Sequence, residues 1–401
     1  MKLTAGAGKA TIEQSYPMDG FDGEHDTLSV RVVLLAAGAT RVAIAVLEQT
    51  SVHGELVSCL QAAAGRAADV DPGNVFICVS HTFSAPHVDP ASDAGIVADA
   101  VSRAATRAAQ TLRPARIGFG RGTCHANINR DVPTAEGWWL GANEEGVADR
   151  SLAVVRIDDL RGHPIAVLMN YAVQSSVMNE SLTAAGKRLV TADLAGAAAR
   201  HVEEQYGDEA VALFLIGAAG DQGPYLSANR HTIDADRSWS RADVHDRGHL
   251  LVDLLGERLG SEVVRVSASI ACDTAEPALR VIHDSVTVHA QRAPASRDLK
   301  PVTRYDFQPD GTADVPIAIA LIGDIAFIGV QPELNAVTGL DIKTRSPLRK
   351  TLVVTMVNGG AKYMADSASY DKITYEAMNS RYARGSAEAV AAKVLAILED
   401  Q

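Results

Sequence analysis

Short apolar segments with strand-like composition alternate with alanine-rich helical segments along most of the 401-residue chain. Residues 28–35 and 41–49 are rich in valine, leucine and isoleucine and are joined by a tight turn, which is typical of paired strands. Residues 55–69 and 94–114 instead have apolar residues at helical spacing. Alternation of strands and helices indicates α/β layers, and the hairpin-like pairs favour a mixed sheet. The sequence therefore predicts an α/β fold with mixed β-sheets flanked by helices.

Most of the remaining chain continues this alternation, but two polar stretches interrupt it. Further strands are expected at residues 74–80, 151–157, 164–171, 211–216, 315–321, 324–330 and 352–357, and further helices at 192–205, after Pro332 and at 385–398. The runs 264–271 and 280–289 resemble a pair of hairpin strands. Residues 225–247 and 291–313 lack periodicity and are expected to be lids, binding loops or solvated surface excursions. Because no repeat or linker is visible, residues 1–401 are expected to form one α/β domain.

Charge and hydropathy narrow the classes of partner. The formal net charge is −12, which argues against nucleic acid and anionic membranes as partners. No apolar run comes near the length of about 18 residues that spans a bilayer, and the first residues lack the apolar core of a signal peptide. We therefore expect a cytoplasmic protein with no membrane partner. The four cysteines form no Cys-x-x-Cys pair, so neither a thiolate zinc site nor a disulfide framework is indicated. The expected partner is a small-molecule substrate, and a homo-oligomer is left open.

Five of the predicted strands end in polar or small residues. The carboxyl ends of strands are where open α/β sheets usually present ligands and catalytic groups. A lone histidine at a strand end is more often a structural hydrogen-bonding group, but the five segments together favour one shared site at an edge of the sheet. They supply the candidates His81, Ser84 and His87 after the first strand, Gln174, Ser175 and Ser176 after the second, Asp221 after the third, Glu333 after the fourth and Tyr363 after the fifth.

Nine short motifs occur in an order that matches a known family. They are AGAGKATIE, GFDGEHDTLSVR with its His-Asp-x-Leu-x-x-Arg run, SHTFSAP, NINR, NYAVQSS, TADLAG, LIGAAGDQGP, QPELNAVTG and NGGAKY. In order and spacing they resemble the catalytic domain of the neutral (non-lysosomal) ceramidases, zinc-dependent amidases that cleave N-acyl sphingosines. The resemblance spans nearly the whole chain. It implies the catalytic domain alone, without the immunoglobulin-like C-terminal domain of the larger members.

The resemblance also implies a zinc site in which one ligand is replaced. The family holds zinc with two His, one Glu and one Tyr, and three of these positions are filled here by His81, Glu333 and Tyr363. Gln174 stands at the position of the second His, and a neutral amide oxygen is a poor zinc ligand beside imidazole. Two further polar positions of the family are replaced by Phe83 and Gly223. The expectation is a degenerate zinc site that retains little or no zinc.

If metal binds, the resemblance implies metal-assisted hydrolysis of an amide (N-acyl) or related bond in a small soluble metabolite. Zinc would lower the pKa of bound water to about 7 and polarise the acyl carbonyl. Tyr363 would serve as a ligand or as a hydrogen-bond donor to the oxyanion. Arg130, in the motif NINR, would bind a polar or anionic part of the substrate, and Asp193 and Asp221 would orient other groups. Ceramide itself is not expected, since no apolar surface segment suits extraction of a membrane lipid.

If metal does not bind, two other hypotheses remain. A metal-independent transferase or hydrolase could use His81, Glu333 and Tyr363 as an acid–base set, with His87 as a second imidazole. Its nucleophile would be a serine, for which the candidates are Ser84, Ser175 and Ser176. Alternatively, the chain keeps the pocket as a binding protein without catalysis. In each case the substrate contacts are expected from Arg130, Gln174, Ser84, His87 and Asp221.

Overall fold

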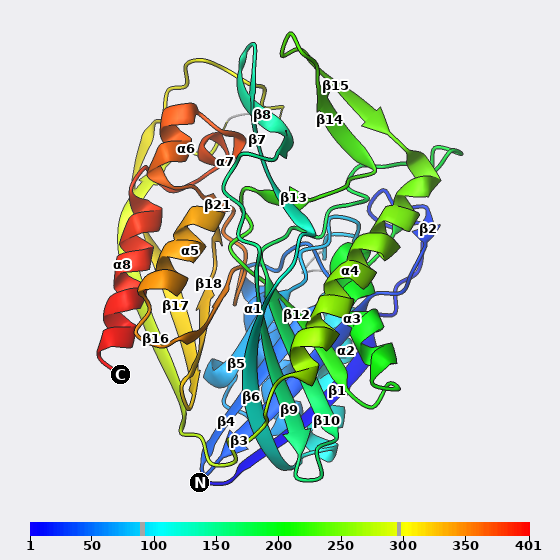
Figure 1. Ribbon diagram of the computed structural model, residues 1–401, viewed down its shortest axis with the longest axis vertical. Coiled ribbons are helices and arrows are strands. Elements are labelled where there is room, and N and C mark those ends of the chain that lie inside the picture. The colour runs from blue at the N-terminus through cyan, green and yellow to red at the C-terminus, as the bar shows by residue number, and fades with distance from the viewer. Residues whose placement is uncertain (89–92, 295–297) are drawn as a thin grey trace.

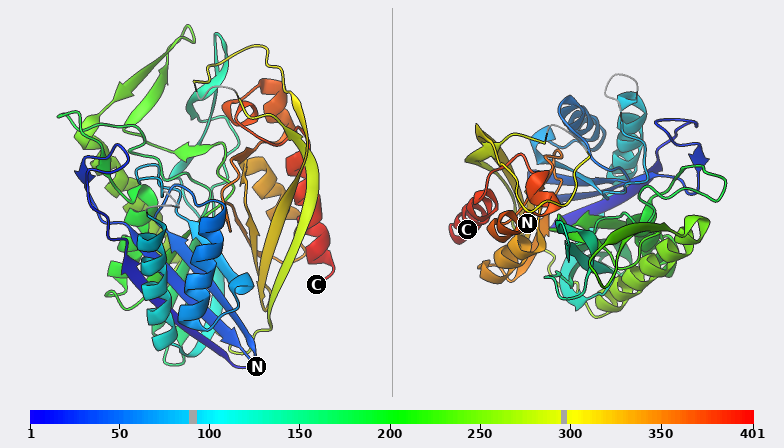
Figure 2. Two further views of the ribbon diagram at one scale, coloured as in Figure 1. Left: turned by 180° about the vertical axis from the view of Figure 1, so that it is seen from behind. Right: turned by 90° about the horizontal axis from the view of Figure 1, so that it is seen from above.

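Two mixed β-sheets lie face to face, and helices cover the outer face of each sheet (Figures 1 and 2). The computed structural model describes residues 1–88, 93–294 and 298–401. In spatial order the first sheet contains β12 (Val211–Ile216), β10 (Pro164–Tyr171), β9 (Ser151–Asp159), β6 (Arg113–Thr123), β1 (Leu3–Thr11), β3 (Ser29–Ala37), β4 (Thr40–Leu47) and β5 (Val75–Val79). The second contains β16 (Leu279–Gln291), β17 (Pro309–Ile322), β18 (Ile325–Val330) and β20 (Lys350–Val354). Both sheets combine parallel and antiparallel neighbours, which confirms the predicted fold class.

Helices and short ladders complete the layers. The first sheet is covered by α1 (Glu55–Ala68), α2 (Ala94–Gln110), α3 (Asp193–Gln205) and α4 (Gly248–Ala268), and the second by α5 (Ala336–Arg345) and α8 (Ser386–Glu399). The short elements are β2 (Gly23–Glu24), β11 (Leu189–Val190), β7 (Asn127–Thr134), β8 (Gly137–Asn143), β13 (Gln222–Pro224), β14 (Asn229–Ile233), β15 (Trp239–Asp243), β19 (Glu333–Leu334), β21 (Tyr363–Met364), α6 (Ser367–Lys372), α7 (Tyr375–Met378) and the 3₁₀ turns η1 (Pro72–Asn74) and η2 (His245–Arg247). Within the described ranges, no helix is long and apolar enough to cross a bilayer.

The central strands of the first sheet are buried on both faces. Along β3, successive side chains point to opposite faces of the sheet. Val32 and Leu34 therefore join the apolar core shared with the covering helices, whereas Val33 and Leu35 join the core shared with the second sheet. This burial explains why the strand is apolar at nearly every position rather than at every second one.

The predicted hairpin between residues 264–271 and 280–289 is wrong. Most of the first segment belongs to the last turns of α4, and the second lies in β16, which pairs with β17. Valines near residue 264 have the β-branched composition of a strand, but the buried side chains of α4 recur every three or four residues, as a helix facing a core requires. These side chains include Val252, Leu255, Leu259, Val263 and Val266.

The two polar stretches contain more regular structure than expected. Residues 225–247 are not only loop, because they include the hairpin β14–β15. This hairpin projects from the sheets beside β7 and β8 (Figure 1). Of residues 291–313, the last belong to β17, and residues 295–297 lie outside the described part of the chain.

A buried arginine connects β3 to the end of β4 and to α3. Arg31, the arginine of the His-Asp-x-Leu-x-x-Arg run, lies on β3 and forms an ion pair of 2.5 Å with Glu48 and one of 2.7 Å with Glu203 of α3. Glu48 also accepts a hydrogen bond from the Ser29 backbone, and Glu203 pairs with Lys9 at 2.7 Å. Arg31, Glu48 and Glu203 are all almost fully buried, so the guanidinium compensates the charge of Glu48 and shares that of Glu203 with Lys9.

We predict that Arg31→Ala lowers the free energy of unfolding by about 3–5 kcal/mol, because it leaves the buried Glu48 without a cation and the buried Glu203 with Lys9 alone. The matched control is Arg41→Ala, which removes a half-exposed guanidinium paired with the exposed Asp69 and should cost at most about 1 kcal/mol. Urea denaturation of the three proteins measures both values. Equal losses for the two variants would contradict the role given to Arg31.

Candidate active site

The ends of four strands bring predicted residues into one buried cluster. His81 follows β5, Gln174 follows β10, and Glu333 and Tyr363 begin β19 and β21. Glu333 Oε2 lies 3.1 Å from His81 Nε2 and accepts a hydrogen bond of 2.8 Å from Gln174 Nε2. Tyr363 is the direct neighbour of Glu333 across the parallel β19–β21 ladder. The structure thus places these four candidates together, with all four side chains buried.

Arg130, on β7, joins this cluster through Gln174. Its Nη1 donates to Gln174 Oε1 at 2.7 Å, and its Nε and Nη2 donate to Glu376 Oε1 at 2.8 and 2.6 Å. The guanidinium carbon lies 5.3 Å from the ring centre of Tyr363 and 5.7 Å from that of Tyr375, within the range of cation–π contacts. Glu376 and Tyr375 are missed by the sequence analysis, because they lie in the short helix α7 and follow no predicted strand.

The two partners of Gln174 determine the orientation of its amide. An arginine side chain can only donate hydrogen bonds, so Gln174 presents its carbonyl oxygen to Arg130. The amide NH₂ group then faces Glu333, whose carboxylate oxygen accepts. The group directed at Glu333 is therefore a donor and offers no lone pair to a metal ion.

The two nitrogens of the His81 imidazole each face an oxygen atom. Its Nδ1 lies 2.5 Å from the carbonyl oxygen of Thr50, and its Nε2 faces Glu333. Burial alone lowers the pKa of His81, but the negative charge of Glu333 and the hydrogen bonds to Glu333 and Thr50 outweigh burial and raise it. The residue has a φ of 60°, a left-handed conformation that turns its side chain out of the strand direction, and Phe83 packs edge-on against the ring at 4.6 Å.

A second carboxyl group, that of Asp131, lies against Glu376 behind Arg130. The oxygens Asp131 Oδ1 and Glu376 Oε2 are buried and have no donor partner among the described residues, yet the two side chains are in hydrogen-bonding contact. Two ionised carboxylates can only accept, so this contact requires a proton on one of them. Burial and the charge of Glu376 raise the pKa of Asp131 well above its usual range, and we therefore assign the proton to Asp131.

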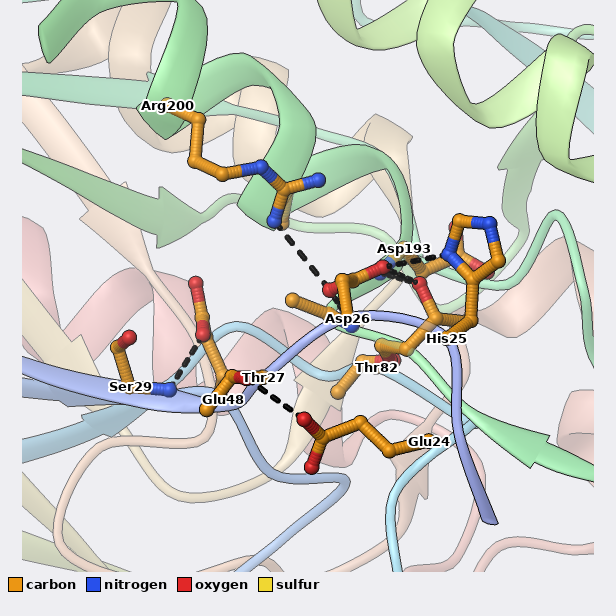
Figure 3. A network of polar contacts seen from close by, with 12 residues as sticks. Glu24, His25, Asp26, Thr27, Ser29, Glu48, Thr82, Asp193 and Arg200 are labelled. Carbon is orange, nitrogen blue, oxygen red and sulfur yellow. Dashed lines mark hydrogen bonds and ion pairs between the residues drawn. The ribbon is translucent and has the colours of Figure 1, made fainter. Parts of the chain in front are cut away.

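Asp26 and Asp193 hold the chain that follows β10 in place (Figure 3). Asp193, the first residue of α3, accepts backbone N–H groups of Val177 and Met178 at 3.0 and 2.8 Å. Asp26 accepts hydrogen bonds from the residues just before α3 and pairs with Arg200 at 3.3 Å. Burial raises the pKa of Asp193 to about 6. These two carboxylates therefore contact the backbone that supports the site rather than the candidate catalytic side chains.

The serine candidates and His87 lie outside the cluster. The Ser175 hydroxyl accepts a hydrogen bond of 2.9 Å from the backbone N–H of Ala195 in α3, which occupies it as a structural group. Ser84 is buried, and its backbone carbonyl oxygen accepts a hydrogen bond from the backbone N–H of Thr191. The Ser176 hydroxyl donates to the backbone carbonyl oxygen of Gln174. His87 is exposed on the surface, where its backbone N–H binds Asp19.

An aromatic cluster covers Arg130 on the side of the two hairpins. Ring contacts run from Tyr363 to Tyr375 at 5.8 Å, from Tyr375 to Trp139 at 5.7 Å and from Trp139 to Trp239 at 6.5 Å. Trp139 belongs to β8 and Trp239 to β15, so the cluster joins both hairpins to the site. These apolar contacts keep the projecting hairpins packed beside the guanidinium of Arg130.

One member of the cluster, Gln174, does not offer a zinc ligand in this arrangement. Zinc binds neutral imidazole nitrogen, carboxylate oxygen and ionised phenol oxygen. Here Gln174 turns an NH₂ group toward Glu333, and this group has no lone pair to give to zinc. Burial raises the pKa of the Tyr363 phenol well above its usual value.

Comparison with known proteins identifies the fold. No family model and no curated protein matches the chain. Among solved structures, the neutral ceramidase from Pseudomonas aeruginosa matches with a TM-score of 0.75 and 16% sequence identity, over 100% of this chain and 75% of that chain. A second structure, of ceramidase complexed with C2, gives the same TM-score and identity over 100% of this chain and 76% of that chain. The predicted resemblance to the neutral ceramidases is thus confirmed for the fold. At 16% identity the match supports no statement about the reaction or the substrate.

Asp221 links the cluster to α5. Its Oδ1 accepts the backbone N–H of Ala336 at 2.8 Å, and its Oδ2 accepts a hydrogen bond of 3.0 Å from Asn129. Burial raises the pKa of Asp221 from its ordinary value of 3.8 to about 7. At pH values between 3.8 and about 7, Asp221 is therefore protonated in the native protein and ionised in the unfolded chain. The stability that this proton contributes falls as the pH rises through this range and is lost above about 7.

We predict that Asp221→Asn flattens the pH dependence of the free energy of unfolding between about pH 5 and 7. In the unmodified protein Asp221 makes this energy fall by up to about 1.4 kcal/mol per pH unit, which is the value of one bound proton. Urea denaturation across the range measures the slope, with Asp208→Asn, at an exposed position, as the control. Equal slopes for Asp221→Asn and the unmodified protein would show that Asp221 does not titrate in this window.

Proposed function

We propose that the protein is a hydrolase that cleaves an amide (N-acyl) or related bond of a small soluble molecule, and that it does so without zinc. The observation that carries the proposal is the buried contact of 3.1 Å between His81 and Glu333, with Arg130 and Tyr363 beside it. A neutral ceramidase is an amidase, so the shared fold supports the same class of reaction. The side chains of His81 and Glu333 are almost fully buried, which strengthens the electrostatic contact between them.

The proposed reaction uses this chain's own acid and base. Glu333 takes a proton from a water molecule, whose oxygen attacks the acyl carbon. The negative charge that develops on the carbonyl oxygen is stabilised by N–H groups of Arg130 and by the Tyr363 hydroxyl. Protonated His81 then donates its Nε2 proton to the leaving nitrogen, the C–N bond breaks, and the proton held by Glu333 returns to His81. The products are the carboxylic acid and the amine.

In this mechanism Gln174 positions the catalytic carboxylate of Glu333. It connects the Arg130 cation to the Glu333 carboxylate, accepting from the first and donating to the second. Glu333 is thereby held in one orientation toward His81. The Glu376 carboxylate holds the other side of Arg130, so the guanidinium is fixed before substrate arrives.

We predict that Glu333→Gln lowers kcat at least about 100-fold, because an amide cannot accept the proton from water. The assay measures amine release from a panel of N-acetylated amino acids and amines, with the exposed Glu257→Gln as the matched control. Full turnover by Glu333→Gln would contradict its role as the base. Saturable binding of a probe by the unmodified protein, without turnover, would contradict hydrolysis and favour a binding protein.

We also predict that Gln174→His binds zinc at least about tenfold more tightly than the unmodified protein, because it replaces an NH₂ group by an imidazole. Elemental analysis and zinc titration measure the content and the affinity. Gln110→His, which adds an imidazole at the exposed end of α2, is the control for zinc binding by an added histidine alone. Stoichiometric zinc that resists chelators in the unmodified protein would contradict the proposal and indicate a conventional metalloamidase.

A further inference from the structure

A separate cavity of about 530 Å³ lies between the two sheets, away from the candidate active site. Its walls come from β6 and β9 of the first sheet and from α5, β20 and the turn between them in the second half of the chain. None of the cluster around Glu333 lines it. Its volume lies within the range of about 300–1,000 Å³ that small-molecule sites occupy.

The lining of this cavity is basic although the chain as a whole is acidic. Arg121, Lys343 and Arg349 line it, and no aspartate or glutamate is among the described residues that do so. The chain has a formal net charge of −12, so a cavity with three cations and no carboxylate among its described lining residues differs in sign from the protein as a whole. Hydroxyl groups of Ser151 and Thr351 also line the walls.

Two of the three cations keep their charge uncompensated. Lys343 is neutralised by the buried carboxylate of Asp149 at 2.7 Å. Arg121 instead donates to the backbone carbonyl oxygen of Arg349 and lies over the ring of Phe119 at 5.7 Å, and neither contact supplies negative charge. Across the described part of the chain, Arg121 and Arg349 pair with no carboxylate. The contact between them keeps Arg121 close to the turn that carries Arg349.

We propose that this cavity binds a small phosphorylated molecule, with its phosphate group between Arg121 and Arg349. A guanidinium group presents a planar set of N–H donors that matches the oxygens of a phosphate, and two such groups can share its charge of nearly −2. The remaining part of the ligand lies against Leu340 and Pro347, which belong to the apolar share of the lining. The ligand bridges the two halves of the fold, because each half supplies one arginine.

Isothermal titration of the full chain with inorganic phosphate tests this proposal. The unmodified protein should bind one phosphate per chain, and the Arg121→Ala/Arg349→Ala double variant should bind at least about tenfold more weakly. The matched control is Arg116→Ala/Arg280→Ala, which removes two exposed arginines that do not line the cavity, one of them on the same strand as Arg121. The control should retain the affinity of the unmodified protein.

A second measurement separates lost binding from misfolding. Phosphate should raise the Tm of the unmodified protein and of the control, but not that of the cavity double variant, whose Tm without phosphate should be close to that of the control. Absence of saturable binding at up to about 10 mM phosphate would overturn the proposal. Equal weakening in both double variants would also overturn it, since it would mean attraction by general charge rather than by this cavity.

Discussion

The Arg130 guanidinium can only donate hydrogen bonds, and this one property sets the direction of the polar contacts around it. Gln174 must turn its oxygen toward Arg130, so its NH₂ group donates to Glu333, and the same carboxylate oxygen lies 3.1 Å from His81 Nε2. On the other side the Glu376 carboxylate accepts from the guanidinium, and burial together with the charge of Glu376 raises the pKa of Asp131. A histidine in place of Gln174 would break this sequence of donors and acceptors and would leave a nitrogen lone pair for a metal.

The scaffold that supports the site is built from groups that do not take part in the proposed chemistry. Asp193 and Asp26 hold the backbone beyond β10 (Figure 3). Arg31 ties β3 to α3 through the buried carboxylate of Glu203 and to the end of β4 through that of Glu48. The motifs that resemble the ceramidases therefore include many structural residues. This explains how a chain can keep the fold, matched over its full length, while a polar position such as that of Gln174 changes.

The sequence predicts the parts of this structure that depend on local patterns. Strand ends carry His81, Gln174, Glu333 and Tyr363, and their location follows from apolar runs that stop at polar residues. The helix α4 is missed because its valines mimic a strand, and only its packing against the first sheet makes the helical spacing decisive. Glu376 and Tyr375 are missed since their role depends on the position of α7 beside Arg130, which no local pattern encodes. The orientation of the Gln174 amide likewise follows only from its partners in space.

The central claim is that Gln174 presents a donor where a zinc site needs a lone pair. Crystals of the unmodified protein soaked in zinc, with diffraction data collected on both sides of the zinc absorption edge, test this claim most directly. The account predicts no anomalous peak bonded to His81 Nε2 and Glu333, and a Gln174 side chain that still bridges Arg130 and Glu333. An anomalous peak within bonding distance of His81 and Glu333, with the Gln174 amide displaced or turned, would contradict it.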